Sequence, residues 1–289
     1  MKILLVGKNG QVGYELERSL QGVGEVRAVD RREMDLSELN MVRAVIRDYQ
    51  PELIINAAAY TAVDQAESEP ALAMRINAEA PAVMAEEAKM LGAALIHYST
   101  DYVFNGAGTA PYTENHPTGP LNMYGKSKLA GEQAIAAAGI HHLILRTSWV
   151  YGLRGKNFLL TIQRLAQQRN RLRIVGDQTG APTWCRTIAD VTAHIVSQSR
   201  VAQDKQTWWE ANSGTYHLAA QGSTSWAGFA REILANAPPT TPAEVEDIGT
   251  ADYPLPAQRP MHSVLSCAKL MERFGPLPEW DHALALCQS

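Results

Sequence analysis

The sequence has few of the features that mark secreted or membrane proteins. Its cysteines are odd in number and lack zinc-type spacing: Cys185, Cys267 and Cys287. Scattered thiols of this kind fit a reducing compartment better than a disulfide framework. No apolar run approaches the roughly 20 residues that span a bilayer, and the apolar start of the chain already ends at Gly7, too early for a signal peptide. We therefore expect a cytoplasmic protein without a membrane partner.

Positive charge is also scarce. Lys and Arg number 26 against 30 Asp and Glu, the formal net charge is -4, and no block of Lys and Arg occurs. A protein that binds nucleic acid usually carries a basic patch or stripe, so we expect no nucleic-acid partner. The rest of the composition, 46% hydrophobic and 19% charged, is ordinary for a globular protein, and 289 residues can form one large domain or two modest ones.

The start of the chain has the order of elements that binds a dinucleotide. Apolar strands are expected over residues 2–6 and 25–29, with helical periodicity between them. Three glycines follow the first strand: Gly7, Gly10 and Gly13. Glycines here let the backbone approach a pyrophosphate, and the helix N-terminus offers N–H groups and the positive end of its dipole. The alternative is a plain strand-to-helix turn, in which the glycines serve only the tight bend.

The end of the second strand gives two conflicting signals about the cofactor. Asp30 would accept a hydrogen bond from an adenosine ribose, which favours NADH. Arg31 and Arg32 follow directly and could hold a 2′-phosphate, which favours NADPH. The two signals conflict, so use of both NADPH and NADH is the natural compromise. The alternative for both arginines is a solvated strand end without a role in binding.

The alternation of helices and strands continues along the first half of the chain. Ser37 is expected to cap a helix that runs to Tyr49. A third strand, over residues 53–59, ends in small residues against which a flat cofactor can lie. The loop over residues 60–64 then falls at the carboxyl end of this strand, where open α/β sheets bind ligands.

Residues 71–91 predict one long helix that is rich in Ala, Met and Glu. Pro81 has no clear place in this helix, because proline lacks the backbone N–H that a helix interior requires. Asn77, a lone polar residue, is expected to be structural.

A fourth strand, over residues 93–98, leads into Thr100. A hydroxyl at this end of a strand can donate a hydrogen bond to a substrate carbonyl. The alternative is a capping threonine. The loop over residues 105–120 is long enough to be functional and is expected to cover the substrate.

Tyr124 and Lys128 lie four residues apart at the expected start of a helix. Residues at this spacing share one helix face, and a nearby positive charge lowers the pKa of a phenol. A tyrosine with a lowered pKa is a suitable general acid for a carbonyl that is reduced to an alcohol. The alternative is a helix with a half-buried Tyr124 and a solvated Lys128.

The pattern predicts an α/β protein with a Rossmann-type doubly wound parallel sheet and a smaller C-terminal substrate-binding lobe. A further strand over residues 142–147 completes the regular part, and beyond it the alternation loosens. We expect a dinucleotide-binding domain over residues 1–150 and a substrate lobe over 151–289, with elements from about residues 187–219 returning to the main sheet. The proline-rich stretch 238–260 predicts loops around one short strand.

Several motifs together resemble the extended short-chain dehydrogenase/reductase family. They are the three glycines, the run over residues 99–104, and the pair Tyr124 and Lys128. The runs over residues 56–64, 97–104, 146–151 and 177–183 are similar, more narrowly, to the dTDP-4-dehydrorhamnose reductases within that family. The resemblance covers nearly the whole chain and weakens over 201–210 and in the C-terminal tail. It implies the reduction, by NADPH or NADH, of the C4 keto group of dTDP-4-dehydro-L-rhamnose, the last step of dTDP-rhamnose biosynthesis.

The resemblance also implies residue roles. Tyr124 would donate a proton to the C4 oxygen, Lys128 would hold the nicotinamide ribose and lower the pKa of Tyr124, and Thr100 would hydrogen-bond the same oxygen. Besides Tyr124 and Lys128, the cofactor would be held by Gly7, Asn9, Gly10, Gln11, Val12, Asp30, Arg31, Asp35, Leu36, Ala57, Ala58, Ala59, Tyr60 and Thr61. The sugar nucleotide would be held by Thr100, Asp101, Tyr102, Trp149 and Arg259. Trp149 could instead be a core aromatic and Arg259 a surface residue.

Some relatives bind magnesium at a dimer interface through carboxylates. Glu15 falls where one carboxylate is expected, but Arg186 falls where we expect another. We therefore predict no metal and keep a homodimer only as a possible assembly.

Two other functions compete with the reductase. A sugar-nucleotide dehydratase or epimerase would recycle tightly held NAD, but a dehydratase needs an Asp-Glu pair where this chain has Asp101 and Tyr102. A non-catalytic, dinucleotide-binding regulatory subunit could share the fold. Such a subunit is expected to lose Thr100, Tyr124 or Lys128, and all three are present.

Overall fold

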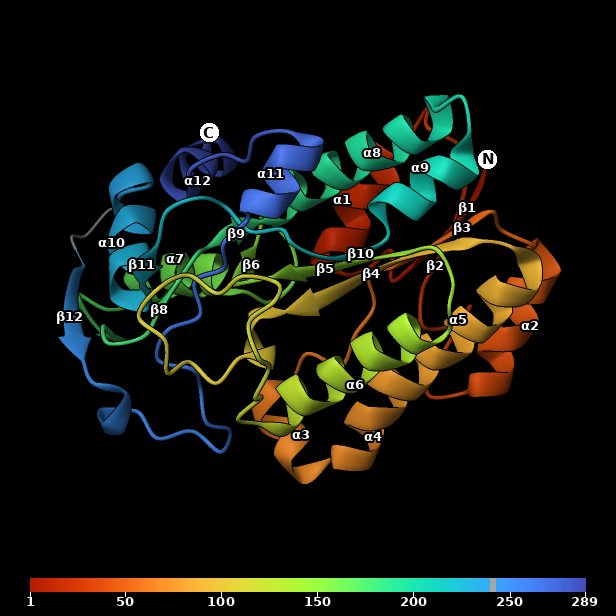
Figure 1. The fold of residues 1–289 in the computed structure, drawn as a ribbon. Coiled ribbons are helices and arrows are strands. Elements are labelled where there is room, and N and C mark those ends of the chain that lie inside the picture. The colour runs from red at the N-terminus through yellow and green to blue at the C-terminus, as the bar shows by residue number, and fades with distance from the viewer. Residues whose placement is uncertain (240–242) are drawn as a thin grey trace.

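A parallel sheet of six strands forms the centre of the computed structural model, which describes residues 1–239 and 243–289 (Figure 1). Its strands are, in chain order, β1 (Lys2–Val6), β2 (Glu25–Val29), β3 (Leu53–Asn56), β4 (Ala94–Thr100), β5 (His142–Thr147) and β10 (Gly214–His217). In space they are ordered β2-β1-β3-β4-β5-β10. β1 pairs with β2 on one side and β3 on the other, so the strand order reverses between β1 and β3. Ligands of open α/β sheets bind at the carboxyl ends of strands at such a point.

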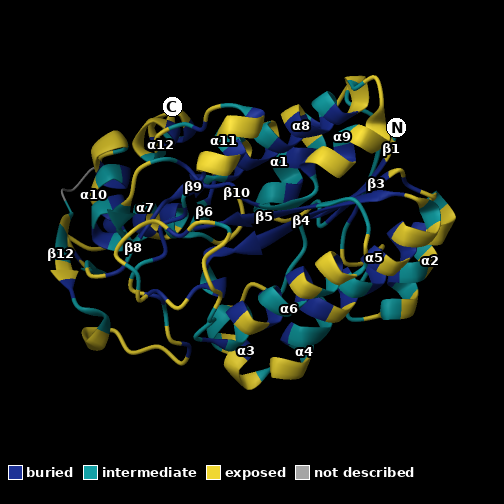
Figure 2. Ribbon diagram, viewed as in Figure 1, coloured by how far each residue is buried: buried dark blue, intermediate teal, exposed yellow. Residues whose placement is uncertain are grey.

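Helices cover both faces of the sheet, which confirms the predicted doubly wound α/β fold. One face carries α1 (Gln11–Ser19), α8 (Cys185–Val201) and α9 (Lys205–Asn212), and the other carries α2 (Leu39–Tyr49), α5 (Ala80–Leu91) and α6 (Met123–Ala137) (Figure 1). Alternate strand residues pack on opposite faces, as Ile3 and Leu5 do in one hydrophobic cluster and Leu4 and Val6 in another. The inner strands β3 and β4 are buried along their whole length, as Figure 2 shows for β4, whereas the edge strand β2 is mostly half-exposed.

The second half of the chain builds a separate hydrophobic cluster beyond the carboxyl ends of the strands. Its larger elements are α7 (Phe158–Ala166), β7 (Arg171–Val175), α10 (Trp226–Asn236), β12 (Glu244–Ile248) and α12 (Trp280–Gln288). The second half also contains the short pieces β6 (Val150–Tyr151), β8 (Thr179–Gly180), β9 (Thr183–Trp184), β11 (Thr224–Ser225) and the 3-10 turn η3 (Thr250–Asp252). The helix α11 (Ala268–Phe274) packs instead in the cluster of the main sheet, through Leu270 and Phe274. The loop predicted over residues 238–260 includes 240–242, which lie outside the described residues. β10 pairs with β5, and the division at residue 150 stays a prediction.

The helix predicted over residues 71–91 is interrupted. It divides into α4 (Pro70–Met74), the π-helical segment η1 (Arg75–Glu79) and α5, and Pro81 is the second residue of α5. The missing N–H of Pro81 cannot bond the Asn77 carbonyl four residues before it, and the wider turn accommodates this loss. Gly131 of α6 packs against the same carbonyl, because an added Cβ there would lie 2.1 Å from the Asn77 oxygen.

The predicted cap at Ser37 is wrong. α2 begins at Leu39 and its N-cap is Glu38, without a capping side-chain hydrogen bond. The Ser37 hydroxyl instead donates to Asp35 Oδ1 at 2.8 Å, so Ser37 braces the loop between β2 and α2. Local sequence favours Ser37 as a cap, but the neighbouring carboxylate competes successfully for its hydroxyl.

Candidate active site

The glycine turn after β1 has the geometry of a phosphate-binding turn. Gly7 adopts φ +93°, which strains any residue with a side chain, and its carbonyl accepts from Gly10 N at 3.0 Å. A Cβ on Gly13 would lie 2.0 Å from the Gly7 oxygen, so only glycine lets α1 start this close to the strand. The N-cap Gly10 offers no side chain to the first N–H groups of α1, which leaves them available to an anion.

Gln11 and Val12, in the first turn of α1, face the protein. Gln11 Oε1 accepts from Asn157 Nδ2 at 2.8 Å and its Nε2 donates to the Val150 carbonyl at 3.4 Å. Val12 packs on the hydrophobic cluster of the sheet. Gln11 therefore links the dinucleotide turn to the start of the second lobe.

At the end of β2 the carboxylate and the cations predicted to choose the cofactor lie together. Asp30 accepts from the backbone N–H of Arg32 at 2.9 Å and from Asn9 Nδ2 at 3.0 Å, and these hydrogen bonds hold the pKa of Asp30 below its usual value. Arg31 is 76% exposed and donates to Asp35 Oδ2 at 3.0 Å. Asp30 and Arg31 therefore lie together directly after β2.

The small residues expected at the end of the third strand follow β3 instead of extending it. The Ala58 backbone N–H donates to Asn56 Oδ1 at 3.1 Å, and a Cβ on Gly7 would lie 2.9 Å from Ala58 N. Ala57 and Ala59 flank this close approach and are half-buried. Leu36 differs from the other predicted cofactor residues, because its side chain is buried in the hydrophobic cluster under β1.

Tyr60 and Thr61 continue this strand end. The Tyr60 N–H donates to Asn77 Oδ1 at 2.8 Å, and Asn77 Nδ2 donates to the Ser127 hydroxyl at 3.0 Å, so Asn77 is a structural link as predicted. The Tyr60 hydroxyl donates to Glu69 at 2.7 Å; burial and this hydrogen bond raise the pKa of Tyr60 to about 12. Thr61 is exposed.

Tyr124 and Thr100 meet at the carboxyl end of β4. Asn122 caps α6 by accepting from Gly125 N at 2.8 Å, which places Tyr124 in the first turn of the helix. Thr100, the last residue of β4, caps the short turn η2 (Asp101–Val103) by accepting from Tyr102 N at 3.1 Å. The rings of Tyr102 and Tyr124 pack edge to face at 5.7 Å.

The electrostatics of Tyr124 differ from the sequence-based expectation. Burial raises the pKa of Tyr124 to about 12, a hydrogen bond with Thr100 opposes the rise, and the Asp101 charge adds to it. The predicted lowering of this pKa by Lys128 is absent. Lys128 Nζ points to β4 instead, where it donates to the Tyr98 carbonyl at 2.6 Å and lies 3.0 Å from His97 Nε2. Burial lowers the pKa of Lys128 to about 8.

Asp101 is a buried carboxyl beside the same hydroxyl. Its Oδ1 accepts from Thr100 Oγ1 at 3.0 Å, whereas Oδ2 is buried without a hydrogen-bond partner. Burial raises the pKa of Asp101 to about 6, and the nearby hydroxyls of Ser263 and Thr100 oppose this rise. An unpaired buried oxygen is costly, and such groups concentrate at functional sites.

Trp149 forms a half-buried aromatic stack beyond β5. It has φ +44° and stacks on Trp226 with ring centres 3.6 Å apart and planes at 6°. A Cβ on Gly180 would lie 2.4 Å from the Trp149 ring, and Trp226 Nε1 donates to Gln178 Oε1 at 3.2 Å. Trp149 also packs against the hydrophobic cluster of the second half of the chain, so its role at the substrate site stays a prediction. Trp226 had no recognisable signal in the sequence.

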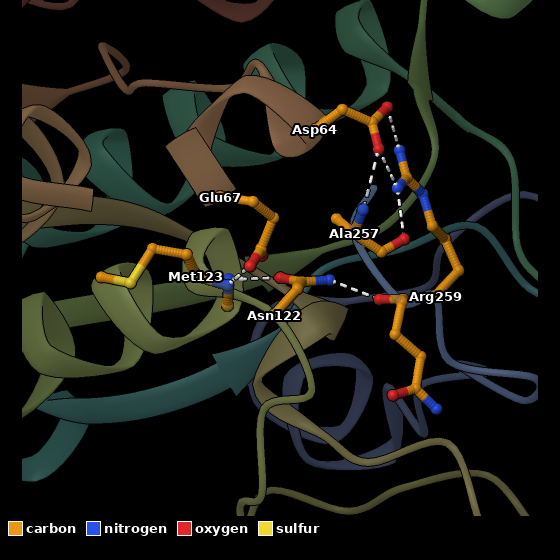
Figure 3. Close-up of polar contacts among 8 residues, drawn as sticks. Asp64, Glu67, Asn122, Met123, Ala257 and Arg259 are labelled. Atoms are coloured by element: carbon orange, nitrogen blue, oxygen red, sulfur yellow. Dashed lines mark hydrogen bonds and ion pairs between the residues drawn. The ribbon is translucent and has the colours of Figure 1, made fainter. Parts of the chain in front are cut away.

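Arg259 is held by Asp64 in a two-point ion pair (Figure 3). Arg259 Nη2 donates to Asp64 Oδ2 at 2.7 Å, and Ala257 N donates to Asp64 Oδ1 at 3.1 Å. Asn122 Nδ2 also donates to the Gln258 carbonyl at 2.7 Å, which joins this loop to the start of α6 (Figure 3). The Arg259 side chain is only 14% exposed, so it is not a surface residue. Asp64, in α3 (Val63–Ser68), was missed because only the fold brings it to Arg259.

Neither a metal site nor a membrane-spanning helix is found in the part of the chain that the structure describes. Within residues 1–239 and 243–289, no group of three or more His, Cys, Asp or Glu side chains is placed to hold a metal ion. In the same part of the chain, none of the helices combines the length and hydrophobicity that crossing a bilayer requires. Arg186, which replaces an expected ligand, lies 3.7 Å from Asp190.

Comparisons with known proteins agree over the whole chain. The family model described as "RmlD substrate binding domain" matches residues 1–289. The dTDP-4-dehydrorhamnose reductase of Burkholderia thailandensis is 48% identical, and the alignment covers 99% of this chain and 98% of that protein.

Solved structures give the same result. A dTDP-4-dehydrorhamnose reductase from Clostridium acetobutylicum superposes with a TM-score of 0.91 at 35% identity, over 99% of this chain and 98% of that one. One from Bacillus anthracis, solved in complex with NADP, superposes with a TM-score of 0.91 at 33% identity and the same coverage.

Proposed function

Because the chain belongs to the family of dTDP-4-dehydrorhamnose reductases, we propose that it reduces the C4 keto group of dTDP-4-dehydro-L-rhamnose to dTDP-L-rhamnose. This is the last step of dTDP-rhamnose biosynthesis. The observation that carries the proposal is the meeting of Tyr124 and Thr100 at the carboxyl end of β4, in a sheet whose β1 ends in the glycine turn. NADPH or NADH supplies the hydride, and the chain supplies orientation and the proton.

Tyr124 donates the proton to the C4 oxygen. With a pKa near 12, its phenol is fully protonated at neutral pH and therefore always ready to donate. As negative charge develops on the C4 oxygen, that oxygen becomes a stronger base than the phenolate, so the proton moves from Tyr124. The Thr100 hydroxyl stabilises the same charge by donating a hydrogen bond. Lys128 holds the nicotinamide ribose and balances the phenolate that remains.

The residues predicted to hold the cofactor gather around β1, β2 and β3. The glycine turn offers Gly7, Asn9, Gly10, Gln11 and Val12 to the pyrophosphate, and the end of β3 offers Ala57 to Thr61 to the flat ring system. Asp30 would accept from the ribose, whereas Arg31, held by Asp35, would bind a 2′-phosphate. The Bacillus anthracis relative was solved with NADP bound, which supports NADPH as a cofactor that Asp30 and Arg31 would bind.

The sugar nucleotide is proposed to lie between the two lobes. Trp149, backed by Trp226, presents an indole face to a sugar or a pyrimidine. Arg259 would bind the diphosphate with a guanidinium already oriented by Asp64. Asp101 and Tyr102 would contact the sugar near the reacting carbon.

The dehydratase and regulatory-subunit alternatives lose support. A dehydratase of this fold requires a second carboxylate after Asp101, and Tyr102 instead packs its ring on Tyr124. A non-catalytic regulatory subunit would not require the Tyr124 hydroxyl to lie beside Thr100, because it transfers no proton. The cytoplasm is the proposed location, because the three cysteines are free and buried. A homodimer without bridging metal stays a prediction, which sedimentation of the purified chain would test.

One incubation tests the function. The protein is mixed with dTDP-4-dehydro-L-rhamnose and either NADPH or NADH, and the sugar nucleotide formed is identified. We expect stoichiometric oxidation of the reduced cofactor and formation of dTDP-L-rhamnose. Conversion of a sugar nucleotide without net use of the cofactor would instead indicate the dehydratase or epimerase.

A further inference from the structure

The segment over residues 254–260, which carries Arg259, depends on side chains for its attachment. Within the part of the chain that the structure describes, no backbone–backbone hydrogen bond joins this segment to another element. Asp64 of α3 instead accepts from the Ala257 N–H at 3.1 Å and binds the Arg259 guanidinium. Ala257 is buried, whereas the six residues before it are exposed. The side chains that hold the segment therefore decide where Arg259 lies.

Asn122 holds the same segment with one end of its amide and the helix α6 with the other. Its Oδ1 caps α6 by accepting from the Gly125 N–H at 2.8 Å, and its Nδ2 donates to the Gln258 carbonyl at 2.7 Å (Figure 3). A flipped amide would turn its NH2 group against an N–H and its oxygen against a carbonyl, so both partners fix its orientation. Asn122 is buried, and water therefore does not readily replace a lost partner.

The short helix α3 joins the same two elements from another side. Asp64 binds the segment, and Glu67, three residues later on the same helix face, accepts from the Met123 N–H at 2.7 Å. The three elements thus form one closed set of contacts, which Figure 3 shows. We call this set the junction; its members are Asp64, Glu67, Asn122, Met123, Ala257, Gln258 and Arg259.

The junction sets the place of the Arg259 guanidinium relative to Tyr124. Tyr124 follows the cap Asn122 by two residues, in the first turn of α6. The ring of Tyr102 packs on Tyr124, and Arg259 is close enough to Tyr102 to oppose the rise that burial and the Asp101 charge cause in the pKa of Tyr102. A shift of the segment would therefore move the guanidinium relative to the proposed proton donor.

We propose that Asn122 is a positioning residue for Arg259: its amide links the cap of α6 to the Gln258 carbonyl and so holds the guanidinium ready for the diphosphate of the sugar nucleotide. A side chain that is already ordered loses less conformational entropy when the ligand binds. The part that concerns the diphosphate rests on the proposed reduction, whereas the attachment of the segment by Asn122 does not.

The variant Asn122→Ser separates the two roles of the amide. Serine is a good cap, so α6 should keep its start, but the shorter side chain cannot also bind the Gln258 carbonyl. We expect KM for dTDP-4-dehydro-L-rhamnose to rise about three- to tenfold, while kcat and the affinity for NADPH change by less than about twofold. Asn122→Ala should give the same rise in KM with a lower melting temperature, because it also loses the cap. An unchanged KM in Asn122→Ser, or a loss confined to kcat, overturns the proposal.

A double-mutant cycle shows whether Asn122 acts through Arg259. In an Arg259→Ala background there is no guanidinium to position, so Asn122→Ser should raise KM by less than about twofold. An equal rise in both backgrounds overturns the proposal. Asp204→Ser is the matched control, because it puts serine at the cap of α9, where Asp204 accepts from the Gln206 N–H at 2.9 Å. It should leave KM unchanged, and a similar rise in this control would also overturn the proposal.

Hydrogen exchange of the Ala257 amide provides a readout that needs no substrate. This N–H is bonded to Asp64 within the junction. Followed by NMR, its exchange should be about threefold faster or more in Asn122→Ser, because the segment opens more often once Gln258 is released. An unchanged exchange rate overturns the proposal even if the reduction is confirmed. Faster exchange in a protein that reduces no sugar nucleotide would refute the proposed function and support the attachment of the segment by Asn122.

Discussion

Arg259 and Asp64, 195 positions apart in the chain, form a two-point ion pair that ties the C-terminal loop to α3. The same loop is bound through the Gln258 carbonyl to Asn122, the cap of α6 (Figure 3). The residue proposed to bind the diphosphate is thus connected to the helix that carries Tyr124. A bound diphosphate and Asp64 would then share one guanidinium.

The first prediction concerns this guanidinium. Arg259→Lys keeps the charge but loses the fork, so we expect KM for the sugar nucleotide to rise about tenfold or more. The affinity for NADPH should not change, because Arg259 lies outside the glycine turn. Steady-state kinetics and a binding titration measure the two effects. Arg171→Lys, an exposed control in β7, should alter neither, and an unchanged KM in Arg259→Lys would remove Arg259 from the substrate site.

The second prediction concerns cofactor choice. Arg31→Ala should weaken NADPH binding by about tenfold or more and leave NADH binding nearly unchanged, because only NADPH carries a 2′-phosphate. Binding titrations of the parent protein and the variant with NADPH and with NADH give the change in affinity for each cofactor. Arg164→Ala, which removes an exposed arginine from α7, is the matched control. Equal losses for both cofactors would show that Arg31 supports the loop through Asp35 and does not read the phosphate.

The third prediction concerns the buried carboxyl of Asp101. Its pKa of about 6 exceeds the ordinary 3.8, so between these values the folded state binds more protons than the unfolded chain. Stability therefore falls as the pH rises through this window and stays lower above it. Asp101→Asn removes the penalty, and its free energy of unfolding at pH near 8 should exceed that of the parent by up to about 3 kcal/mol. Near pH 4 the difference should largely vanish.

Asp177→Asn is a control of opposite sign. Burial alone would raise the pKa of Asp177, but hydrogen bonds from Thr250 outweigh burial and hold this pKa below its usual value. Its carboxylate therefore stabilises the fold above the unfolded-state pKa, and this contribution is lost as the pH falls. The variant should be less stable than the parent at neutral pH. Urea unfolding at both pH values measures the pair, and a destabilised Asp101→Asn near pH 8 would contradict the third prediction.

The fourth prediction concerns the contact between α6 and the π-helical segment η1. Gly131→Ala would place a Cβ 2.1 Å from the Asn77 carbonyl, so α6 must move. We expect a loss of about 1–3 kcal/mol in the free energy of unfolding, with a lower kcat because Tyr124 moves with the helix. Gly119→Ala, whose Cβ would meet Asn105 only at 3.6 Å, should have little effect. Equal stability of the two variants would exclude close packing at Gly131.

Elements that depend on a local pattern were predictable. β1, β2 and β5 lie at the predicted residues, because short runs dominated by apolar residues favour strands even where β2 includes Arg27 and β5 includes Arg146. The π-helical segment η1 could not be predicted from a local pattern. It depends on Pro81 and on the close packing of Gly131, which belongs to the distant helix α6. Similarly, Ser37 has the sequence of a cap but gives its hydroxyl to Asp35.

The sequence predicted which residues gather at the candidate site better than it predicted which atoms they contact. Tyr124 and Thr100 lie together because one follows a strand end and the other starts a helix at the same edge. The direction of Lys128 could not be read from its spacing to Tyr124, because it depends on the register that places His97 beside Asn56. These residue roles stay predictions until a variant tests them.

The most direct test follows the hydride and the proton in one reaction. The parent protein and Tyr124→Phe are each given dTDP-4-dehydro-L-rhamnose and NADPH deuterated at the transferred position. The account predicts dTDP-L-rhamnose with deuterium at C4 from the parent, and from Tyr124→Phe a rate lower by about 100- to 10,000-fold with unchanged NADPH affinity and stability. Deuterium at any other carbon, or full activity without the Tyr124 hydroxyl, would contradict the account.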